Sequence, residues 1–136
     1  MKKVFYHGSS TSNLKKLIPQ IRFTPTGGEY KGLVYLTPNK GYACCHAFPW
    51  SSDEGFDLDM NDETRELTFK IPEEHAHRLK IPIYIYEVEG SEYKEMKGSV
   101  FTNLDYVSDK EVQIVDATKY SSVKEGLEEN GVSIII

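Results

Sequence analysis

The sequence predicts a mixed α+β domain organised around antiparallel strands, with a few short helices. Most of the apolar residues fall in short runs that are β-branched or that alternate with polar residues, as is typical of strands. Segments with the start signals of a helix are fewer, and none is long. Because 136 residues with 39% hydrophobic content suffice for one core, we expect a single domain over residues 1–136.

Strands are expected where apolar runs have this character. In chain order they are residues 3–7 (KVFYH), 33–37 (LVYLT), 66–71 (ELTFKI), 81–90 (IPIYIYEVEG), 110–117 (KEVQIVDA) and 132–136 (VSIII). Residues 20–32 (QIRFTPTGGEYKG) contain Pro25, Gly27 and Gly28, which favour a loop over a regular element.

Short helices are expected where a residue that can cap an N-terminus precedes an apolar stretch. The expected segments are residues 13–18, capped by Ser12 or Asn13, residues 40–48, capped by Asn39, and residues 123–130, where Ser122 and Glu125 form a capping box before Asn130 and Gly131. Residues 72–79 (PEEHAHRL) add a further short helical stretch.

The charge of the chain is unevenly distributed around a net value of −5. Residues 1–32 contain six Lys and Arg side chains and one Glu, a net charge of +5, which leaves −10 for the remainder. Such a basic third would attract phosphate oxygens of a dinucleotide or of a nucleic-acid backbone, or would only form a solvated lysine-rich face. Residues 51–66 hold seven acids and one Arg, which predicts a mobile surface loop.

The acidic segment contains a partial match to a calcium-binding loop. Asp57, Asp59 and Asn61 alternate as oxygen ligands would. However, Asp62 stands where the turn needs glycine, and Thr68 stands where a bidentate Glu is needed. We therefore expect no calcium site.

The histidines and cysteines give no zinc-ligand spacing either. His75 and His77, two positions apart, would point to different faces of a helix. Cys44 and Cys45 are neighbours, so a structural disulfide between them is geometrically unfavourable, and buried free thiols in a reducing compartment are expected. No segment has the length of a signal sequence or a membrane span, which favours a cytoplasmic protein without a membrane partner.

Three residues in a fixed order suggest a function. They are His7 in VFYHGSS, Tyr35 in VYLT, and Glu111 in SDKEVQIVD. The blocks HGSSTSNLKKLIPQ, KGLVYLTPNKGYACCH and YVSDKEVQIVD resemble the diphtheria-toxin-like class of ADP-ribosyltransferases with a His-Tyr-Glu triad, a class that includes the poly(ADP-ribose) polymerase catalytic domain. The chain is also similar to the small rifampin-inactivating ADP-ribosyltransferases. The resemblance implies a fold of split antiparallel sheets and NAD as the ADP-ribose donor.

The resemblance also implies a role for each residue. Breaking the nicotinamide–ribose bond develops positive charge on the ribose, which the carboxylate of Glu111 would stabilise. His7 would form a hydrogen bond with the ribose, and the bare backbone of Gly8 would approach the nicotinamide amide. Ser9 would add a hydroxyl contact, and Tyr35 would stack on the nicotinamide ring.

A second aromatic wall is usual in this class, and Tyr42 is the candidate for it. Each triad member has a structural alternative: His7 as a core histidine, Tyr35 as a core tyrosine, and Glu111 as an exposed residue at a strand start. In the rifampin-type enzymes the catalytic acid is an aspartate elsewhere, so further acids stay in reserve. These are Glu89, Glu92 and Asp105.

The expected activity is therefore transfer of a single ADP-ribose from NAD, with no metal. The acceptor stays open between a protein, a nucleic acid, a small molecule and water, because acceptor choice lies in surface loops. Related RNA 2′-phosphotransferases depend on arginines, and Arg22, Arg65 and Arg78 are not next to the motifs. The alternative from another class is a non-catalytic module on the same fold that binds NAD or ADP-ribose or acts through a protein partner. Whether a regulatory protein partner exists, as an antitoxin does for a toxin, also stays open.

Overall fold

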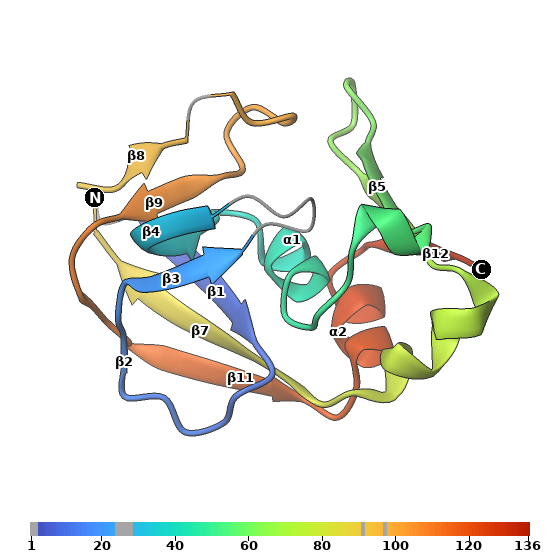
Figure 1. Ribbon diagram of the computed structural model, residues 1–136, viewed down its shortest axis with the longest axis horizontal. Helices are drawn as coiled ribbons and strands as arrows, with labels where there is room; N and C mark the ends of the chain where they lie inside the picture. Colours follow the sequence, from blue (N-terminus) through green and yellow to red (C-terminus); the bar gives the residue numbers. More distant parts are fainter. Residues whose placement is uncertain (1–2, 24–28, 91, 97) are drawn as a thin grey trace.

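Strands in several small sheets make up most of the protein, and its helices are few and short (Figure 1). This arrangement is seen in a computed structural model that describes residues 3–23, 29–90, 92–96 and 98–136. The predicted mixed α+β class is confirmed. Most strand pairs are antiparallel, as expected.

A three-stranded antiparallel sheet carries the His-Gly motif. Its order is β1 (Val4–Ser9), β7 (Ile83–Glu89) and β11 (Asp116–Tyr120). The central strand, β7, is rich in Ile, Val and Tyr, residues that fill both faces of a buried strand. His7 is opposite Tyr86 and Gly8 is opposite Ile85, which fixes the motif against the most buried strand.

A second sheet adjoins the first at the edge of β1. Its order is β3 (Gln20–Phe23), β4 (Glu29–Leu36), β9 (Tyr106–Ser108) and β8 (Lys94–Glu95). Backbone hydrogen bonds between Tyr6 and Thr37, just after β4, join the two sheets. The short strands β2 (Lys16–Leu17) and β10 (Val112–Gln113) pair with each other.

A third sheet and the helices form the other half of the molecule. Here β5 (Asp57–Met60) pairs antiparallel with β6 (Leu67–Lys70), and β6 pairs parallel with β12 (Ser133–Ile135). The helices are α1 (Lys40–Cys45), α2 (Val123–Glu129) and the 3-10 helices η1 (Ser52–Glu54) and η2 (Glu73–Lys80). Asn39 and Ser122 cap α1 and α2 by accepting hydrogen bonds from Tyr42 N–H and Glu125 N–H, as predicted.

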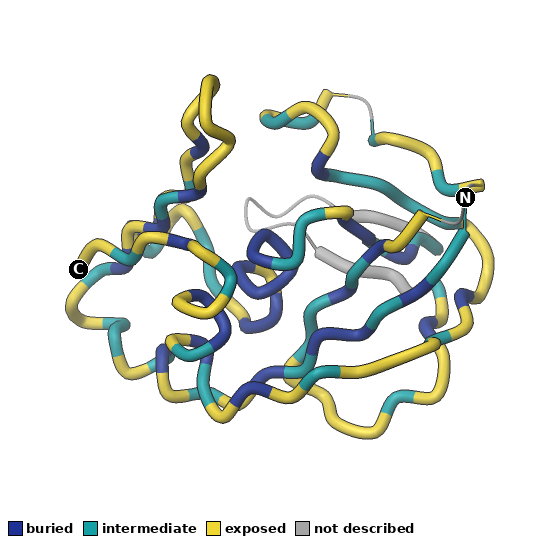
Figure 2. The backbone as a smooth tube through the Cα atoms, turned by 180° about the vertical axis from the view of Figure 1, so that it is seen from behind, coloured by how far each residue is buried: buried dark blue, intermediate teal, exposed yellow. Residues whose placement is uncertain are grey.

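Two hydrophobic cores lie on either side of β1. Figure 2 shows that the buried residues are concentrated in the central strands of the protein and in α1. The larger core, called the helical core, joins α1 and α2 to β6 and β7. The smaller core, called the sheet core, consists of Phe5, Leu17, Val34, Leu36, Val88 and Val112. Cys44 and Cys45 are free and buried in the helical core, which confirms the prediction.

Several predicted elements were wrong. Residues 13–18 form no helix: Asn13 has a φ of 59° and Lys16–Leu17 is a strand, because Leu17 packs in the sheet core. The predicted loop 20–32 is a strand at both of its ends, and its centre, residues 24–28, lies outside the described residues. The predicted strand 110–117 is divided between β10 and β11. The acidic segment 51–66 contains η1 and the paired strand β5, so it is not a simple loop.

Candidate active site

A pocket of about 220 Å³ opens beside β1. Its walls come from β1, from the segment that follows it, from β2 and from β4. The described residues that line it are His7, Ser9, Thr11, Leu14, Lys16, Leu17, Ile18 and Val34. Because ligand pockets usually measure about 300–1,000 Å³, this pocket has room for one part of a dinucleotide.

His7 reaches the pocket because side chains alternate along a strand. Phe5, His7 and Ser9 share one face of β1; Phe5 packs in the sheet core, and the other two line the pocket. The Nδ1 atom of His7 lies 2.8 Å from the carbonyl oxygen of Tyr35. A carbonyl can only accept, so Nδ1 carries the proton, and in the neutral ring Nε2 is the accepting nitrogen. The Tyr35 carbonyl thus fixes both the tautomer and the orientation of a buried histidine.

Gly8 lies on the opposite face of β1, against α1. A Cβ atom at this position would be 2.0 Å from the carbonyl oxygen of Ala43 and 2.9 Å from the Cβ of Ala47. The absence of a side chain therefore serves the close approach of strand and helix. A contact of the Gly8 backbone with nicotinamide stays a prediction.

Ser9 and the segment after it form the outer wall of the pocket. The Ser9 hydroxyl accepts a hydrogen bond from Thr11 N–H at 3.0 Å. Tyr86, on β7, donates its hydroxyl proton to the Thr11 carbonyl at 2.5 Å and accepts from Leu14 N–H at 3.3 Å. This irregular segment is therefore anchored to β7, the central strand of the three-stranded sheet.

Tyr35 takes part in the site through its backbone. It pairs with Val107 on β9, while its neighbours Val34 and Leu36 point into the sheet core. Because side chains alternate along β4, the ring of Tyr35 lies on the other face of this strand. Its side chain is not one of the described pocket-lining groups. Stacking on nicotinamide stays a prediction.

Tyr42 lies on α1 and is 7% exposed. Its hydroxyl donates to the carboxylate of Asp105 at 2.8 Å, and the hydroxyl of Ser99 donates to the same carboxylate. Burial, and then the charge of Asp105, raise the pKa of Tyr42 above its usual range. His46, just after the end of α1, is exposed. Its ring centroid lies 4.5 Å from that of Tyr42 and 5.8 Å from that of Trp50, on which it stacks. The structure thus gives Tyr42 a packing role, and its role as an aromatic wall stays a prediction.

Glu111 precedes β10, whose partner strand is β2. Its carboxylate lies 3.3 and 3.4 Å from the ammonium group of Lys16. Lys16 also lines the pocket together with His7. His7 therefore lies in the pocket wall, and Glu111, which is not among the described residues that line the pocket, is connected to it through the ion pair with Lys16.

Lys16 is the residue that sequence reasoning missed. The helix expected over residues 13–18 contains both Lys15 and Lys16 and distinguishes neither. The pairing of β2 with β10 places Lys16 opposite Gln113 and next to Glu111. That contact spans 95 positions in the sequence, so no local signal could have revealed it.

The reserve acids and the arginines lie elsewhere. Asp105 is bound by Tyr42, and neither Glu89 nor Glu92 is among the described residues that line the pocket. Arg78 binds Glu54 and Arg65 donates to the Thr102 carbonyl, so neither serves this pocket. The predicted candidate Arg22 has its side chain outside the described part of the structure.

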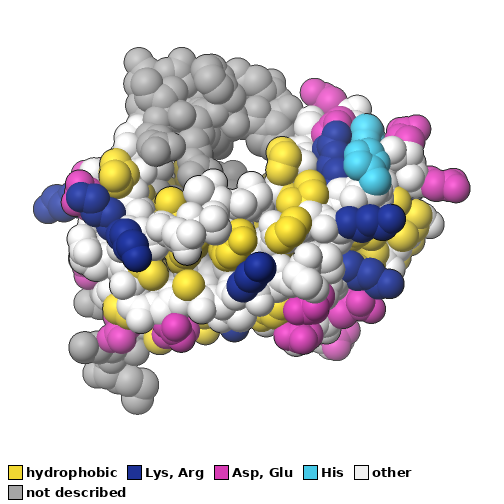
Figure 3. Space-filling view, turned by 90° about the horizontal axis from the view of Figure 1, so that it is seen from below, with side chains coloured by type: hydrophobic (Ala, Val, Ile, Leu, Met, Phe, Trp, Pro, Cys, Tyr) yellow, Lys and Arg dark blue, Asp and Glu magenta, His cyan; other side chains and the backbone are white. Residues whose placement is uncertain are grey.

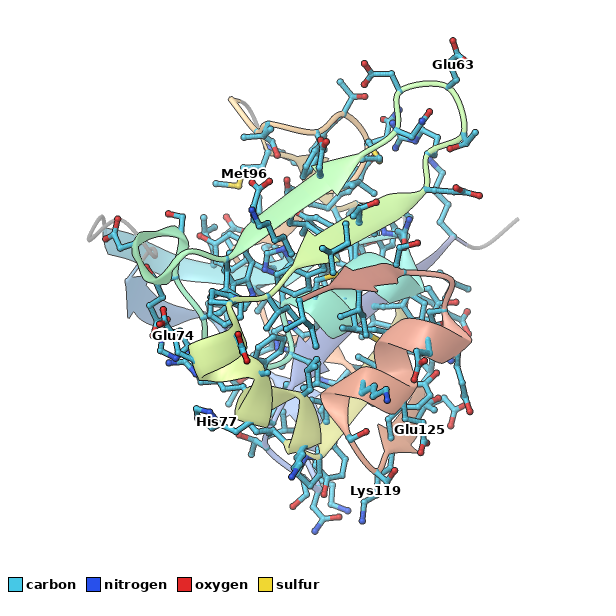
Figure 4. All side chains as sticks on the ribbon, turned by 90° about the vertical axis from the view of Figure 1, so that its right-hand side faces the viewer. Glu63, Glu74, His77, Met96, Lys119 and Glu125 are labelled. Carbon is cyan, nitrogen blue, oxygen red and sulfur yellow. The ribbon has the colours of Figure 1, made fainter. Side chains whose placement is uncertain are left out.

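No metal site accompanies the pocket in the described part of the chain, where no group of three or more His, Cys, Asp or Glu side chains could hold an ion. In Figure 4, Glu63 lies far from Glu74 and His77, which both belong to η2. Figure 3 shows Lys and Arg side chains interspersed with Asp and Glu on the face seen there, so this face is not uniformly basic. None of the described helices is long and apolar enough to cross a membrane.

Comparisons with protein-family models, with curated proteins and with solved structures found no match for this chain.

Proposed function

We propose that the protein is an ADP-ribosyltransferase that uses NAD as donor and has the split-sheet fold of that class. The observation that carries the proposal is that His7, held by the Tyr35 carbonyl, lines a pocket together with Lys16, whose ammonium group pairs with the Glu111 carboxylate. The Tyr35 carbonyl links the second predicted motif to the first. The contacts of His7 with Tyr35 and of Lys16 with Glu111 support the proposal that the three blocks form one site.

The chemistry needs what this pocket offers. With Nδ1 donating to Tyr35, the Nε2 atom of His7 accepts a hydrogen bond from a ribose hydroxyl and orients the sugar. As the bond to nicotinamide breaks, positive charge develops on the ribose. Glu111 then supplies the negative charge that stabilises this cation. The volume of about 220 Å³ accommodates part of the donor, and the rest extends past the rim.

The test is nicotinamide release from NAD by the purified protein, with and without cell lysate as a source of acceptor. Glu111→Gln should reduce release by roughly 100-fold or more, because the shape of the side chain is kept and its charge is lost. Glu128→Gln is the matched control, since Glu128 is an exposed acid on α2 and should leave release unchanged. Acceleration by lysate would assign the acceptor to a cell component, and labelled NAD would then identify it.

A non-catalytic module that binds NAD or ADP-ribose is the competing function. It would bind NAD saturably, with binding weakened by His7→Ala, and would release no nicotinamide. The absence of both binding and release would overturn the proposed function.

A further inference from the structure

We propose that Lys16 is a positioning residue that exchanges partners during donor binding: it holds Glu111 in the donor-free protein and transfers to a phosphate of the donor. This inference rests on the proposed function, since it concerns the same pocket. It assigns a task to a side chain that no motif singled out.

Within the described part of its lining, the pocket has one cation to offer a phosphate. Among the described residues that line it, Lys16 is the only Lys or Arg. The other polar lining groups are the imidazole of His7 and the hydroxyls of Ser9 and Thr11. A dinucleotide brings a pyrophosphate with two negative charges, and a donor that enters this pocket needs a cation nearby.

The present partner of Lys16 is easily replaced. The side chains of Lys16 and Glu111 are 45% and 51% exposed, and their charged atoms lie 3.3 Å apart. Exposed ion pairs of this kind contribute little to stability, because water screens them and two long side chains must be held still. A phosphate offers stronger, charge-assisted hydrogen bonds to the same ammonium group. Exchange of the carboxylate for the phosphate is therefore favourable.

The exchange has a consequence for Glu111. While Lys16 holds it, the carboxylate is neutralised by a cation and is less able to stabilise positive charge on a ribose. Once the phosphate binds Lys16, the carboxylate is released from its ion pair and becomes available to the donor's ribose. Donor binding would thus prepare the residue that acts on it.

The neighbouring Lys15 provides a matched comparison. It is exposed, it has the same charge, and it is not among the described residues that line the pocket. A general electrostatic effect of the basic segment would act through both lysines, whereas the proposed exchange acts through Lys16 alone.

The experiment measures binding of ADP, which contains the pyrophosphate but lacks the nicotinamide ribose. Lys16→Met should weaken ADP binding about tenfold, the value of one lost charge-assisted contact. Lys15→Met should leave it within about twofold, as a screened surface charge. Lys16→Arg should largely restore it, and the affinity for adenosine, which has no phosphate, should be the same in all variants.

The exchange itself has a separate readout. In side-chain carbon NMR, saturating ADP should move the Glu111 carboxylate resonance of the unmodified protein toward its position in ADP-free Lys16→Met. A Glu111 resonance that stays in place while ADP binds would overturn the exchange, as would equal ADP affinities for Lys16→Met and Lys15→Met.

Different experimental results would overturn the proposed function and the proposed role of Lys16. Nicotinamide release combined with Lys16-independent ADP binding would overturn the role of Lys16 and leave the enzyme intact. Lys16-dependent ADP binding without any nicotinamide release would overturn the transferase and keep the phosphate contact. Loss of both ADP binding and release would overturn both.

Discussion

The two faces of β1 differ in what they tolerate and in what they can do. On one face, Gly8 meets the carbonyl of Ala43 so closely that no side chain fits. On the other face, His7 and Ser9 line a pocket that opens to solvent. Consecutive residues of one motif thus serve two purposes, packing and binding. The residues of a motif on a strand cannot all be assigned to ligand binding, because alternate side chains point to opposite faces of the strand.

The largest expected contrast between the faces is in thiol reactivity. Cys44 and Cys45 lie on the α1 side and are 0% exposed. Burial raises the pKa of Cys44 to about 12 and also raises that of Cys45. At pH 8 these native thiols should react with a disulfide reagent about a thousandfold more slowly than the thiol of Ser9→Cys, which lines the pocket.

Reaction in urea is the control for this contrast, because all the thiols should react alike once the chain is unfolded. Equal rates in the native protein would show that the α1 side is open. The raised pKa values also predict that the free energy of unfolding falls as pH rises above about 8.5, since the unfolded chain loses its thiol protons first.

Gly8→Ala tests the packing of the α1 face directly. The new methyl would meet backbone atoms of Ala43, which cannot move aside as a flexible side chain could. We expect the free energy of unfolding to fall by about 3 kcal/mol in urea denaturation. Ser9→Ala, on the pocket face, should cost about 1 kcal/mol for its lost hydrogen bond. Similar losses for the two variants would contradict the close contact with α1.

His7 tests the pocket face, with a smaller effect that falls mainly on activity. His7→Ala should lower nicotinamide release about 100-fold and stability by about 1 kcal/mol. His7→Asn offers an amide N–H to the Tyr35 carbonyl in place of Nδ1–H, so it should recover stability but not release. Recovery of release by Asn would mean that the ring nitrogen Nε2 does not act on the donor.

The smallest expected effect concerns the ion pair between Arg78 and Glu54, which lies beyond the α1 face of β1. Arg78 donates two hydrogen bonds to Glu54 at 2.8 and 2.5 Å and lies over the ring of Phe56 in the helical core. The hydrogen bonds from Arg78 hold the pKa of Glu54 below its usual value. This stabilisation is present above the ordinary Glu pKa of about 4.3 and is lost as pH falls through the lowered folded-state pKa.

Glu54→Gln should therefore reduce the acid sensitivity of unfolding between pH 5 and pH 3, with little change in the pocket. Arg78→Gln should have a similar effect, and the double variant should fall short of the sum of the two, because both changes remove the hydrogen bonds between Arg78 and Glu54. Additive effects in urea titrations would show that the two side chains act independently.

The sequence predicted those elements whose signal is local. Alternating apolar runs predicted β1, β6, β7 and β12, and Asn39 and Ser122 predicted the starts of α1 and α2. The prediction failed at residues 13–18, where a helix-like capping signal competes with tertiary pairing. Leu17 is buried in the sheet core and pairs with Val112, and this burial outweighs the local preference for a helix.

The site was predictable to the same extent. The motif order singled out His7, which lines a pocket, and Glu111, which pairs with the lining residue Lys16, but their catalytic roles stay predictions. It could not reveal that Gly8 is required by α1, that Tyr42 binds Asp105, or that Lys16 joins the two ends of the site. Each of these contacts depends on segments brought together by folding, so no sequence window contains it.

The hydroxyl of Tyr86 has one further consequence. It ties the carbonyl of Thr11 and the amide of Leu14 to the centre of the sheet, although the segment between them has no regular structure. A ligand entering here would not have to order this wall, so it would spend little of its binding energy on immobilising the chain. The same tie fixes the length of the segment: one residue more or fewer between Ser9 and Lys16 would move one of the two anchor points away from the hydroxyl. Insertions at this turn should therefore be poorly tolerated, in contrast to most exposed connections.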